Sequence, residues 1–419
     1  MTRFFVYMVA ASLTLPVAAQ RGDPHLARAR AILREVPLVD GHNDLPWELR
    51  SNWALTFDSL DIRRTTPNHT DIARLRSGMV GAQFWSTYTP SSFGPGHIAA
   101  RGAMEQNDVV YRLVERYPDV FEIALTAEDV WRIFRAGKIA SMLGLEGGHM
   151  IENSLGALRA FYRDGVRYMT LTHSRNTDWA DASTDTLAHG GLTRFGDEVV
   201  REMNRLGMLV DISHVADSTM WDVLRVSEAP VIFSHSSSRH FAPHPRNVPD
   251  DVARALAQND GVIMVTFVPG FIHGPTYEWG QRQDSIRRAS GDAAAQGWAQ
   301  ANPTPMPDLG VIADHLEHLR DVAGVDHVGI GGDFDGIGSV PVGLEDVSTY
   351  PALVAELLRR GWSDGDVKKV VGLNALRVMA EAERVAARLQ RERAPSTAQI
   401  EILDGWETSP PWRVPSSRP

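Results

Sequence analysis

Eight short, nearly uninterrupted apolar segments constrain the fold of this chain more than any other feature of its sequence. Each is rich in Val, Ile, Leu, Met or aromatic residues and lacks polar alternation, which is typical of a strand buried on both faces. They cover residues 37–44, 80–88, 139–148, 167–173, 208–214, 230–237, 261–268 and 327–336.

Helical patterns separate many of these segments, with apolar residues spaced three and four positions apart and, in several cases, a terminal glycine. The order of strands and helices predicts an α/β fold, a (β/α)₈ TIM barrel with insertions. A doubly wound open sheet is the alternative, but it calls for a glycine-rich phosphate loop after the first strand, and "GHNDLP" at 41–46 is not one. The helical patterns cover residues 104–117, 154–165, 195–207, 218–227, 249–261 and 308–324.

The length of 419 residues, 43% of them hydrophobic, allows one large core or two ordinary ones. We predict one barrel domain over residues 20–392, followed by a surface tail over 393–419 that is rich in proline, serine and charge. A polar insertion at 272–307 follows the seventh strand, as either a lid or a decoration.

The first nineteen residues carry one arginine, an apolar run and small residues before Gln20, which predicts a signal peptide cleaved after Ala19. A buried N-terminal helix is the alternative. We therefore expect a secreted or periplasmic protein, without a transmembrane anchor, since no later segment is apolar enough to span a bilayer. The net charge is −10 and no basic run occurs, so we expect no nucleic-acid partner.

Polar side chains end most of the predicted strands. In a barrel the carboxyl ends of all strands meet on one face, where active sites lie. These side chains should therefore share one cavity there. They are His42, Asp44, Glu146, His173, His214, His235, Asp333 and Asp335.

The chain has no cysteine, so it forms no disulfide and any metal ion must be held by His, Asp and Glu. That donor set suits Zn²⁺, Mn²⁺, Fe²⁺ or Co²⁺. Glu146 is placed to bridge two metals about 3.5–4 Å apart, with a bridging hydroxide as nucleophile. Small residues follow it in "LEGG", which would let backbone and metals approach closely. The other expected metal ligands are His42, Asp44, His214 and His235.

Each of these residues also has a purely structural interpretation. A single histidine at a strand end is more often a core or surface residue than a ligand. We leave eleven of the fifteen histidines in that class, including His149, His189 and His244. Glu146 alone could cap a helix, and Asp333 and Asp335 could belong to a loop or a Ca²⁺-like turn.

Seven motifs between Pro37 and Ala382, in order and with matching spacing, resemble the membrane dipeptidase (renal dipeptidase) family, peptidase family M19 of the amidohydrolase superfamily. The resemblance implies a barrel that binds two Zn²⁺ per chain and hydrolyses dipeptides. The motifs are "DGHNDLPW", "GLEGGH", "RYMTLTHSRNTDWAD", "DISHV", "FSHSSS", "RNVPDD" and "VGIGGDFDG".

The resemblance also implies a role for each matched residue. His42 and Asp44 would bind one zinc, His214 and His235 the second, and Glu146 would bridge the two. The remaining roles are His173 for substrate contact and oxyanion stabilisation, Arg246 for the substrate carboxylate and Asp333 for acid/base catalysis and substrate contact. An arginine fork pairs well with a carboxylate, and an acid must protonate the leaving nitrogen.

Two departures from the animal members concern specificity and anchoring. Arg175 stands where they have a cysteine, and we expect it to favour acidic substrate side chains. The chain ends without an apolar tail, so we expect no lipid anchor of their kind.

We therefore expect a zinc dipeptidase that acts on L-Xaa-L/D-Xaa dipeptides. The sequence does not decide between a monomer and a homodimer. Another amidohydrolase reaction on the same metals is the first alternative: N-acyl amino acid deacylation, lactone hydrolysis or β-lactam opening. A neutral lactone would not need the Arg246 clamp. The second alternative is a binding protein that keeps the barrel without the chemistry, which the complete ligand set disfavours.

Overall fold

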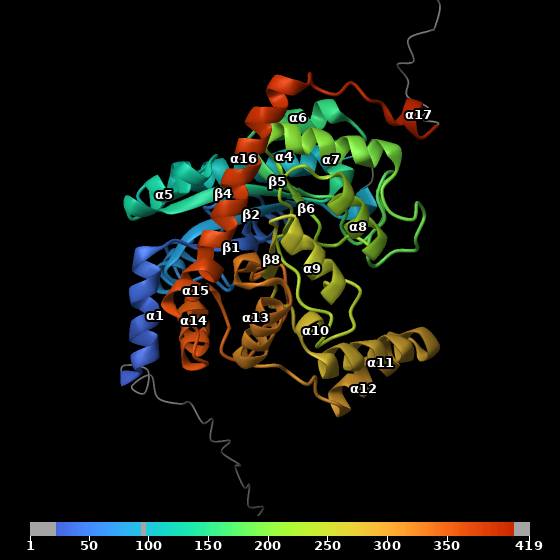
Figure 1. The fold of residues 1–419 in the computed structure, drawn as a ribbon. Coiled ribbons are helices and arrows are strands. Elements are labelled where there is room, and N and C mark those ends of the chain that lie inside the picture. Colours follow the sequence, from blue (N-terminus) through green and yellow to red (C-terminus); the bar gives the residue numbers. More distant parts are fainter. Residues whose placement is uncertain (1–21, 94–97, 406–419) are drawn as a thin grey trace, which may run out of the picture.

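The computed structural model describes residues 22–93 and 98–405 and shows a closed barrel of eight parallel strands surrounded by helices (Figure 1). All eight predicted strands form it, so the predicted fold is confirmed. The barrel closes because β1 pairs with both β2 and β9 while β2 pairs with β4. Its strands are β1 (Leu38–Asn43), β2 (Val80–Tyr88), β4 (Ile139–Glu146), β5 (Val166–Thr170), β6 (Leu209–Asp211), β7 (Ile232–Phe233), β8 (Val262–Val265) and β9 (Val328–Ile330).

One strand lies outside this barrel and was not predicted. The strand β3 (Phe121–Ile123) pairs with the first residues of β4, on the edge that β5 takes from Leu143 onward. It is short and only Phe121 is buried, so it lacks an apolar run that would reveal it in the sequence.

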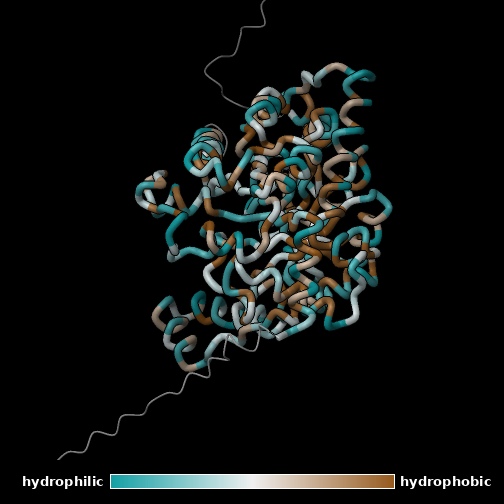
Figure 2. Tube along the Cα trace, turned by 90° about the vertical axis from the view of Figure 1, so that its left-hand side faces the viewer, coloured by the Kyte–Doolittle hydropathy of each residue, from teal (hydrophilic) through white to brown (hydrophobic). Residues whose placement is uncertain are grey.

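Helices cover the outside of the barrel, and apolar segments gather inside it while hydrophilic segments lie outward (Figure 2). The six predicted helices are present as α4 (Ala99–Arg116), α6 (Leu155–Arg163), α7 (Arg194–Leu206), α8 (Asp217–Val226), α9 (Asp250–Gln258) and α13 (Leu309–Ala323). The others are α1 (Pro24–Glu35), α2 (Leu45–Asn52), α3 (Ile72–Ser77), α5 (Ala127–Arg135), α10 (Pro269–Ile272), α11 (Gly274–Ser290), α12 (Asp292–Ala301), α14 (Tyr350–Arg359), α15 (Asp364–Lys368), α16 (Asn374–Glu392) and α17 (Ile400–Leu403).

The polar insertion forms a helical hairpin of α11 and α12 that extends away from the barrel (Figure 1). Trp279 and Trp298 pack between the two helices, with ring centroids 5.4 Å apart. Few of its residues are buried, Thr276 and Ala295 among them, so the hairpin makes little contribution to the core.

The described part of the predicted C-terminal tail packs on a helix of the barrel. Residues 393–405 of the predicted tail lie against α7: Ser396 donates to Glu198, and Asp404 accepts a hydrogen bond from Thr193 at 2.6 Å. The predicted signal peptide, 1–19, and residues 406–419 lie outside the described residues. Among the helices that the structure describes, none has the length and apolarity of a membrane span.

Candidate metal centre

Four strands bring a carboxylate and three imidazoles together at the carboxyl end of the barrel. Glu146 is the last residue of β4, and its Oε1 lies 3.1 Å from Nε2 of His214 and 3.3 Å from Nε2 of His235. Its Oε2 lies 3.5 Å from Nε2 of His42 in β1. The two carboxylate oxygens thus face two different sets of histidines, as a bridging ligand requires.

The cluster divides into overlapping groups of ligand atoms, each compact enough to hold one ion. Nε2 of His42 also lies 3.3 Å from Oδ2 of Asp44, which precedes α2. Every ligand atom within a group lies within 4.8 Å of the others. The groups are His42–Glu146–His235, Glu146–His173–His214 and His42–Asp44–Asp333.

Glycines let the carboxylates reach these positions. A Cβ at Gly336 would lie only 2.2 Å from Oδ2 of Asp44 and 2.7 Å from Oδ1 of Asp333. Gly147, directly after Glu146, has a φ of 131°, which L side chains rarely adopt, and a Cβ at Gly148 would collide with the Leu171 carbonyl. The "LEGG" glycines therefore serve the backbone turn and its packing against the loop after β5.

The donor atoms fit divalent cations. Nε2 of His42 is buried and has no hydrogen-bond partner. Burial lowers the pKa of His214 and of His235 well below the ordinary value, so both imidazoles are neutral at pH 7, the form that binds metal. Burial alone would raise the pKa of Glu146, but His42, His173 and the other histidines hold it well below the ordinary value. Neutral imidazoles with a carboxylate suit Zn²⁺ and similar transition metals.

A buried tyrosine fixes which nitrogen of His42 faces this cluster. The Tyr168 hydroxyl donates to the Gly41 carbonyl at 3.3 Å and lies 2.8 Å from Nδ1 of His42. Because burial raises the pKa of Tyr168, the hydroxyl keeps its single hydrogen, and Nδ1 of His42 must supply the other. Without metal, the effect of burial on His42 is outweighed by Tyr168, Asp44 and Glu146, which raise its pKa well above the ordinary value. In the neutral ring that binds metal, Nε2 is free of hydrogen and directed at Asp44 and Glu146.

A cavity of about 450 Å³ opens above the cluster. Glu146, His173 and Asp333 line it together with the aromatic side chains of Trp47, Tyr88 and Phe271. The cavity is large enough to hold a dipeptide-sized ligand.

Arg246 lines the same cavity as a charged group without an acidic partner. It is 2% exposed, and its Nη atoms donate to Ser236 Oγ at 3.0 Å and to the His235 carbonyl at 3.1 Å. Its Nε has no partner, and burial lowers its pKa to about 10, so it stays charged at pH 7. A buried guanidinium without a salt bridge calls for an anion.

Two further cavity residues are tuned for proton chemistry. Burial, reinforced by Asp44 and Glu146, raises the pKa of Asp333 well above the ordinary value. Burial lowers the pKa of His173, which stacks on His214 with centroids 4.4 Å apart. The pKa shifts of these two residues therefore have opposite directions, and His173 is neutral at pH 7.

The structure brings all the predicted ligands together with His173, Arg246 and Asp333, but it separates Asp335 and Arg175 from them. Asp335 accepts a hydrogen bond from the His69 backbone at 2.6 Å and does not line the cavity. Arg175 is exposed beside Asp185, whose pKa it helps to lower, and is absent from the cavity lining. The geometry gives no support to its expected preference for acidic substrates.

Sequence reasoning missed several residues of the cavity. His244, which we predicted to be a core or surface histidine, lines it and packs on Phe271 with ring centroids 4.3 Å apart. Phe271 comes from α10, next to the insertion. Trp47 and Tyr88 were detectable, since Trp47 lies in the "DLPW" motif and Tyr88 ends a predicted strand.

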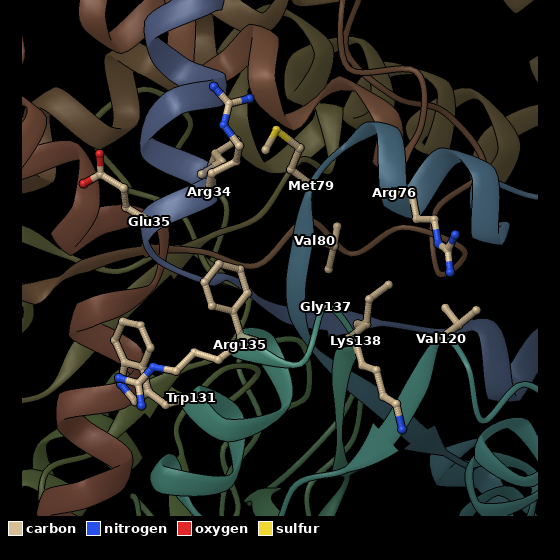
Figure 3. Close-up of a pocket in the computed structure, with 13 residues that line it drawn as sticks. Arg34, Glu35, Arg76, Met79, Val80, Val120, Trp131, Arg135, Gly137 and Lys138 are labelled. Atoms are coloured by element: carbon tan, nitrogen blue, oxygen red, sulfur yellow. The ribbon is translucent and has the colours of Figure 1, made fainter.

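A larger hollow of about 710 Å³ lies at the opposite end of the barrel, beside Val80 and Ile139, where β2 and β4 begin (Figure 3). Its charged side chains, among them Arg34, Arg76 and Lys138, spread around the rim and do not converge on one point (Figure 3). The converging donor atoms described above line the cavity at the carboxyl end instead.

Comparisons with known proteins show the family of this chain. The sequence profile described as membrane dipeptidase (peptidase family M19) matches residues 26–393. The dipeptidase verJ of Clonostachys rogersoniana is 44% identical over 378 residues, covering 88% of this chain and 90% of that protein. The crystal structure of the probable dipeptidase PvdM from Pseudomonas aeruginosa superposes with a TM-score of 0.78 at 23% identity, over 86% of this chain and 99% of that chain.

A second solved structure of the same fold contains a ligand. It is a metallopeptidase from Rhodobacter sphaeroides with a phosphinate mimic of the dipeptide L-Ala-D-Ala, with a TM-score of 0.68 at 24% identity, over 83% of this chain and 99% of that chain.

Proposed function

The chain belongs to the membrane dipeptidase family, peptidase family M19, and we propose that it is a zinc enzyme that hydrolyses dipeptides at the centre around Glu146. The observation that carries the proposal is the unpaired, buried Arg246 in the same cavity as the ligand cluster. A carboxylate-binding group at that place fits a substrate with a free C-terminus.

The residues present can hold two cations. His42 and Asp44 would hold one, His214 and His235 the other, and Glu146 would contact both. When bound, such ions supply Lewis-acid polarisation of the scissile carbonyl and activation of a water molecule.

The protein side chains would orient the substrate and move the protons. Arg246 would bind the C-terminal carboxylate through its guanidinium, since no protein carboxylate competes for it. His173, neutral at pH 7, would stabilise the developing negative charge on the carbonyl oxygen. Asp333 would take a proton from the attacking water and deliver it to the leaving nitrogen as the C–N bond breaks.

Matched substrates test the proposal. Wild-type protein with Zn²⁺ should cleave L-Ala-L-Ala and L-Ala-D-Ala and should cleave L-Ala-L-Ala amide, which lacks the carboxylate, at least roughly 100-fold more slowly in kcat/KM, because a charge-assisted pair is lost. Arg246→Ala should remove most of that discrimination. Arg175→Ala, a control at an exposed arginine, should retain it.

Two results would contradict the proposal. One is equal hydrolysis of the acid and the amide by the wild type. The other is a neutral lactone as the better substrate, which would favour the alternative amidohydrolase reaction.

We also propose that the chain is exported, on the strength of the signal-peptide pattern at 1–19. N-terminal sequencing of protein from the native host should begin at Gln20. A mature chain that begins at Met1 would contradict export by this route.

A further inference from the structure

One buried aspartate joins the carboxyl ends of three neighbouring barrel strands. Asp211 is the last residue of β6 and is fully buried. Its Oδ1 accepts hydrogen bonds from the backbone N–H of Ser213 at 3.0 Å and of Ser234 at 2.9 Å. Its Oδ2 accepts from the hydroxyls of Thr170 at 2.5 Å and Ser234 at 2.6 Å.

The Ser234 hydroxyl contacts both this carboxylate and a metal-ligand histidine. Ser234 Oγ lies 2.7 Å from Nδ1 of His235, the next residue. A serine hydroxyl has one hydrogen, and an ionised carboxylate can only accept. The hydrogen of Ser234 therefore goes to Asp211, and the contact with His235 is made by a hydrogen on Nδ1.

We propose that Asp211 acts through Ser234 as a positioning residue that fixes His235 in its Nδ1–H tautomer. Nε2 of His235 then carries no hydrogen and lies 2.9 Å from Nε2 of His214 and 3.3 Å from Glu146 Oε1. Which ring nitrogen of a histidine can bind metal is set by the hydrogen bond that the other nitrogen makes. The expected effect on metal binding rests on the proposed two-metal function. The assignment of the His235 tautomer does not.

The conservative substitution should be the harmful one. In Asp211→Asn the amide oxygen must keep accepting from the two backbone N–H groups, so the amide NH₂ faces the hydroxyls of Thr170 and Ser234. Ser234 then accepts from the amide, and its own hydrogen turns to Nδ1 of His235. The ring hydrogen is driven to Nε2, where it blocks the metal.

Ser234→Ala removes the relay without reversing it, because His235 keeps both tautomers available. The double variant Asp211→Asn/Ser234→Ala should therefore bind metal better than Asp211→Asn alone. If Asp211→Asn instead weakened metal binding because it removes a negative charge or disturbs packing, the double variant would bind metal no better than Asp211→Asn alone.

The first measurement is spectroscopic and needs no metal. Full-length metal-free protein labelled with ¹⁵N-histidine should give an Nδ1–H signal for His235, assigned by its loss in His235→Asn. In Asp211→Asn the signal should change to that of an Nε2–H tautomer. An Nε2–H signal in the wild type would overturn the proposal.

The second measurement is titration of the same preparations with Co²⁺, followed by visible absorption. Asp211→Asn should bind the second Co²⁺ roughly 10- to 100-fold more weakly than the wild type. Ser234→Ala and the double variant should agree with each other and lie between these two. Thr170→Val, which removes a hydroxyl from the same carboxylate oxygen without contacting a histidine, should bind like the wild type.

Two outcomes of the titration would overturn the proposal: Asp211→Asn binding both ions like the wild type, or the double variant binding as weakly as Asp211→Asn. Thermal unfolding of each variant identifies any loss of fold, and the wild-type spectrum decides the case if Asp211→Asn does not fold. A wild type with the expected tautomer but fewer than two Co²⁺ would count against the proposed function and leave the hydrogen-bond assignment in place.

Discussion

At the scale of single residues, the site depends on hydrogens as much as on ligands. Tyr168 directs Nε2 of His42 at the cluster, and Ser234 does the same for His235. Two hydroxyls therefore occupy the place that carboxylates or carbonyls take beside many metal-bound histidines.

Removing the Tyr168 hydroxyl should weaken metal binding without disturbing the fold. In Tyr168→Phe the ring still packs on Phe84, whose centroid lies 5.0 Å away, but His42 is free to change tautomer. Co²⁺ titration should show one ion bound roughly 10- to 100-fold more weakly. The control is Tyr111→Phe, which loses a bond to the Asp164 carbonyl, belongs to none of the ligand groups and should bind Co²⁺ normally. Normal binding by Tyr168→Phe would contradict the role.

Asp335 should make folding pH-dependent. Burial raises its pKa to about 7, above the ordinary value of 3.8. Between pH 3.8 and pH 7, the carboxyl is therefore protonated in the folded state and ionised in the unfolded state. The stabilisation is complete below about pH 4 and is lost as the pH rises through 7, at about 1.4 kcal/mol per pH unit.

In chelated protein, the unfolding free energy of Asp335→Asn relative to wild type should therefore rise between pH 4 and 7 and then level off. Denaturant titrations at several pH values measure this difference. Parallel pH profiles for the two proteins would show that Asp335 titrates normally.

At the scale of elements, the strand ends and the loops that follow them hold the ligands under tight steric limits. Asp40 in β1 accepts from the backbone N–H of His42 and of Gly332, and so joins the end of β1 to the loop after β9. His214 and Asp333 adopt positive φ angles of 68° and 64°, which are uncommon for residues other than glycine. Backbone outliers of this kind concentrate at functional sites.

The loop after β9 offers a direct test of these limits. Gly336→Ala would place a methyl group 2.2 Å from Asp44 Oδ2 and 2.7 Å from Asp333 Oδ1, so one carboxylate must move. We expect kcat/KM for L-Ala-L-Ala to fall by roughly 100-fold, as a displacement of about 1 Å at a reacting group can cause. Gly338→Ala, two residues on, has nothing within 4 Å of its Cβ and should retain activity. Equal activities in the two variants would show that the loop is free to adjust.

Much of the fold and the ligand positions could be predicted from the sequence because buried parallel strands are continuous apolar runs and their carboxyl ends must meet. The hairpin of α11 and α12 could not, because it buries few residues and so has no apolar stripe. Nor could the link from Asp211 through Ser234 to His235, although all three lie in quoted motifs. It depends on the pairing of β6 with β7, where Asp211 lies opposite Ile232.

At the scale of the whole molecule, the metal centre should cross-link the barrel. Its ligands come from the ends of β1, β4, β6 and β7. Metal ions should therefore bind the folded state and not the unfolded chain, and so stabilise the fold.

Zn²⁺ at about 1,000 times its dissociation constant should add about 4 kcal/mol to the unfolding free energy for each ion. Chelation should reverse the gain, and Ca²⁺ should not reproduce it, because Ca²⁺ takes oxygen ligands and three of the donors here are imidazoles. Thermal and denaturant unfolding with each ion measure the effect. Equal stabilisation by Ca²⁺ would contradict the assignment.

The most direct measurement is anomalous X-ray scattering at the zinc absorption edge from crystals of the full chain grown with Zn²⁺. We predict two peaks on either side of the Glu146 carboxylate, about 3.5–4 Å apart, one beside His42 and Asp44 and the other beside His214 and His235. A fully occupied zinc site elsewhere with no peak within bonding distance of Glu146 would contradict the account.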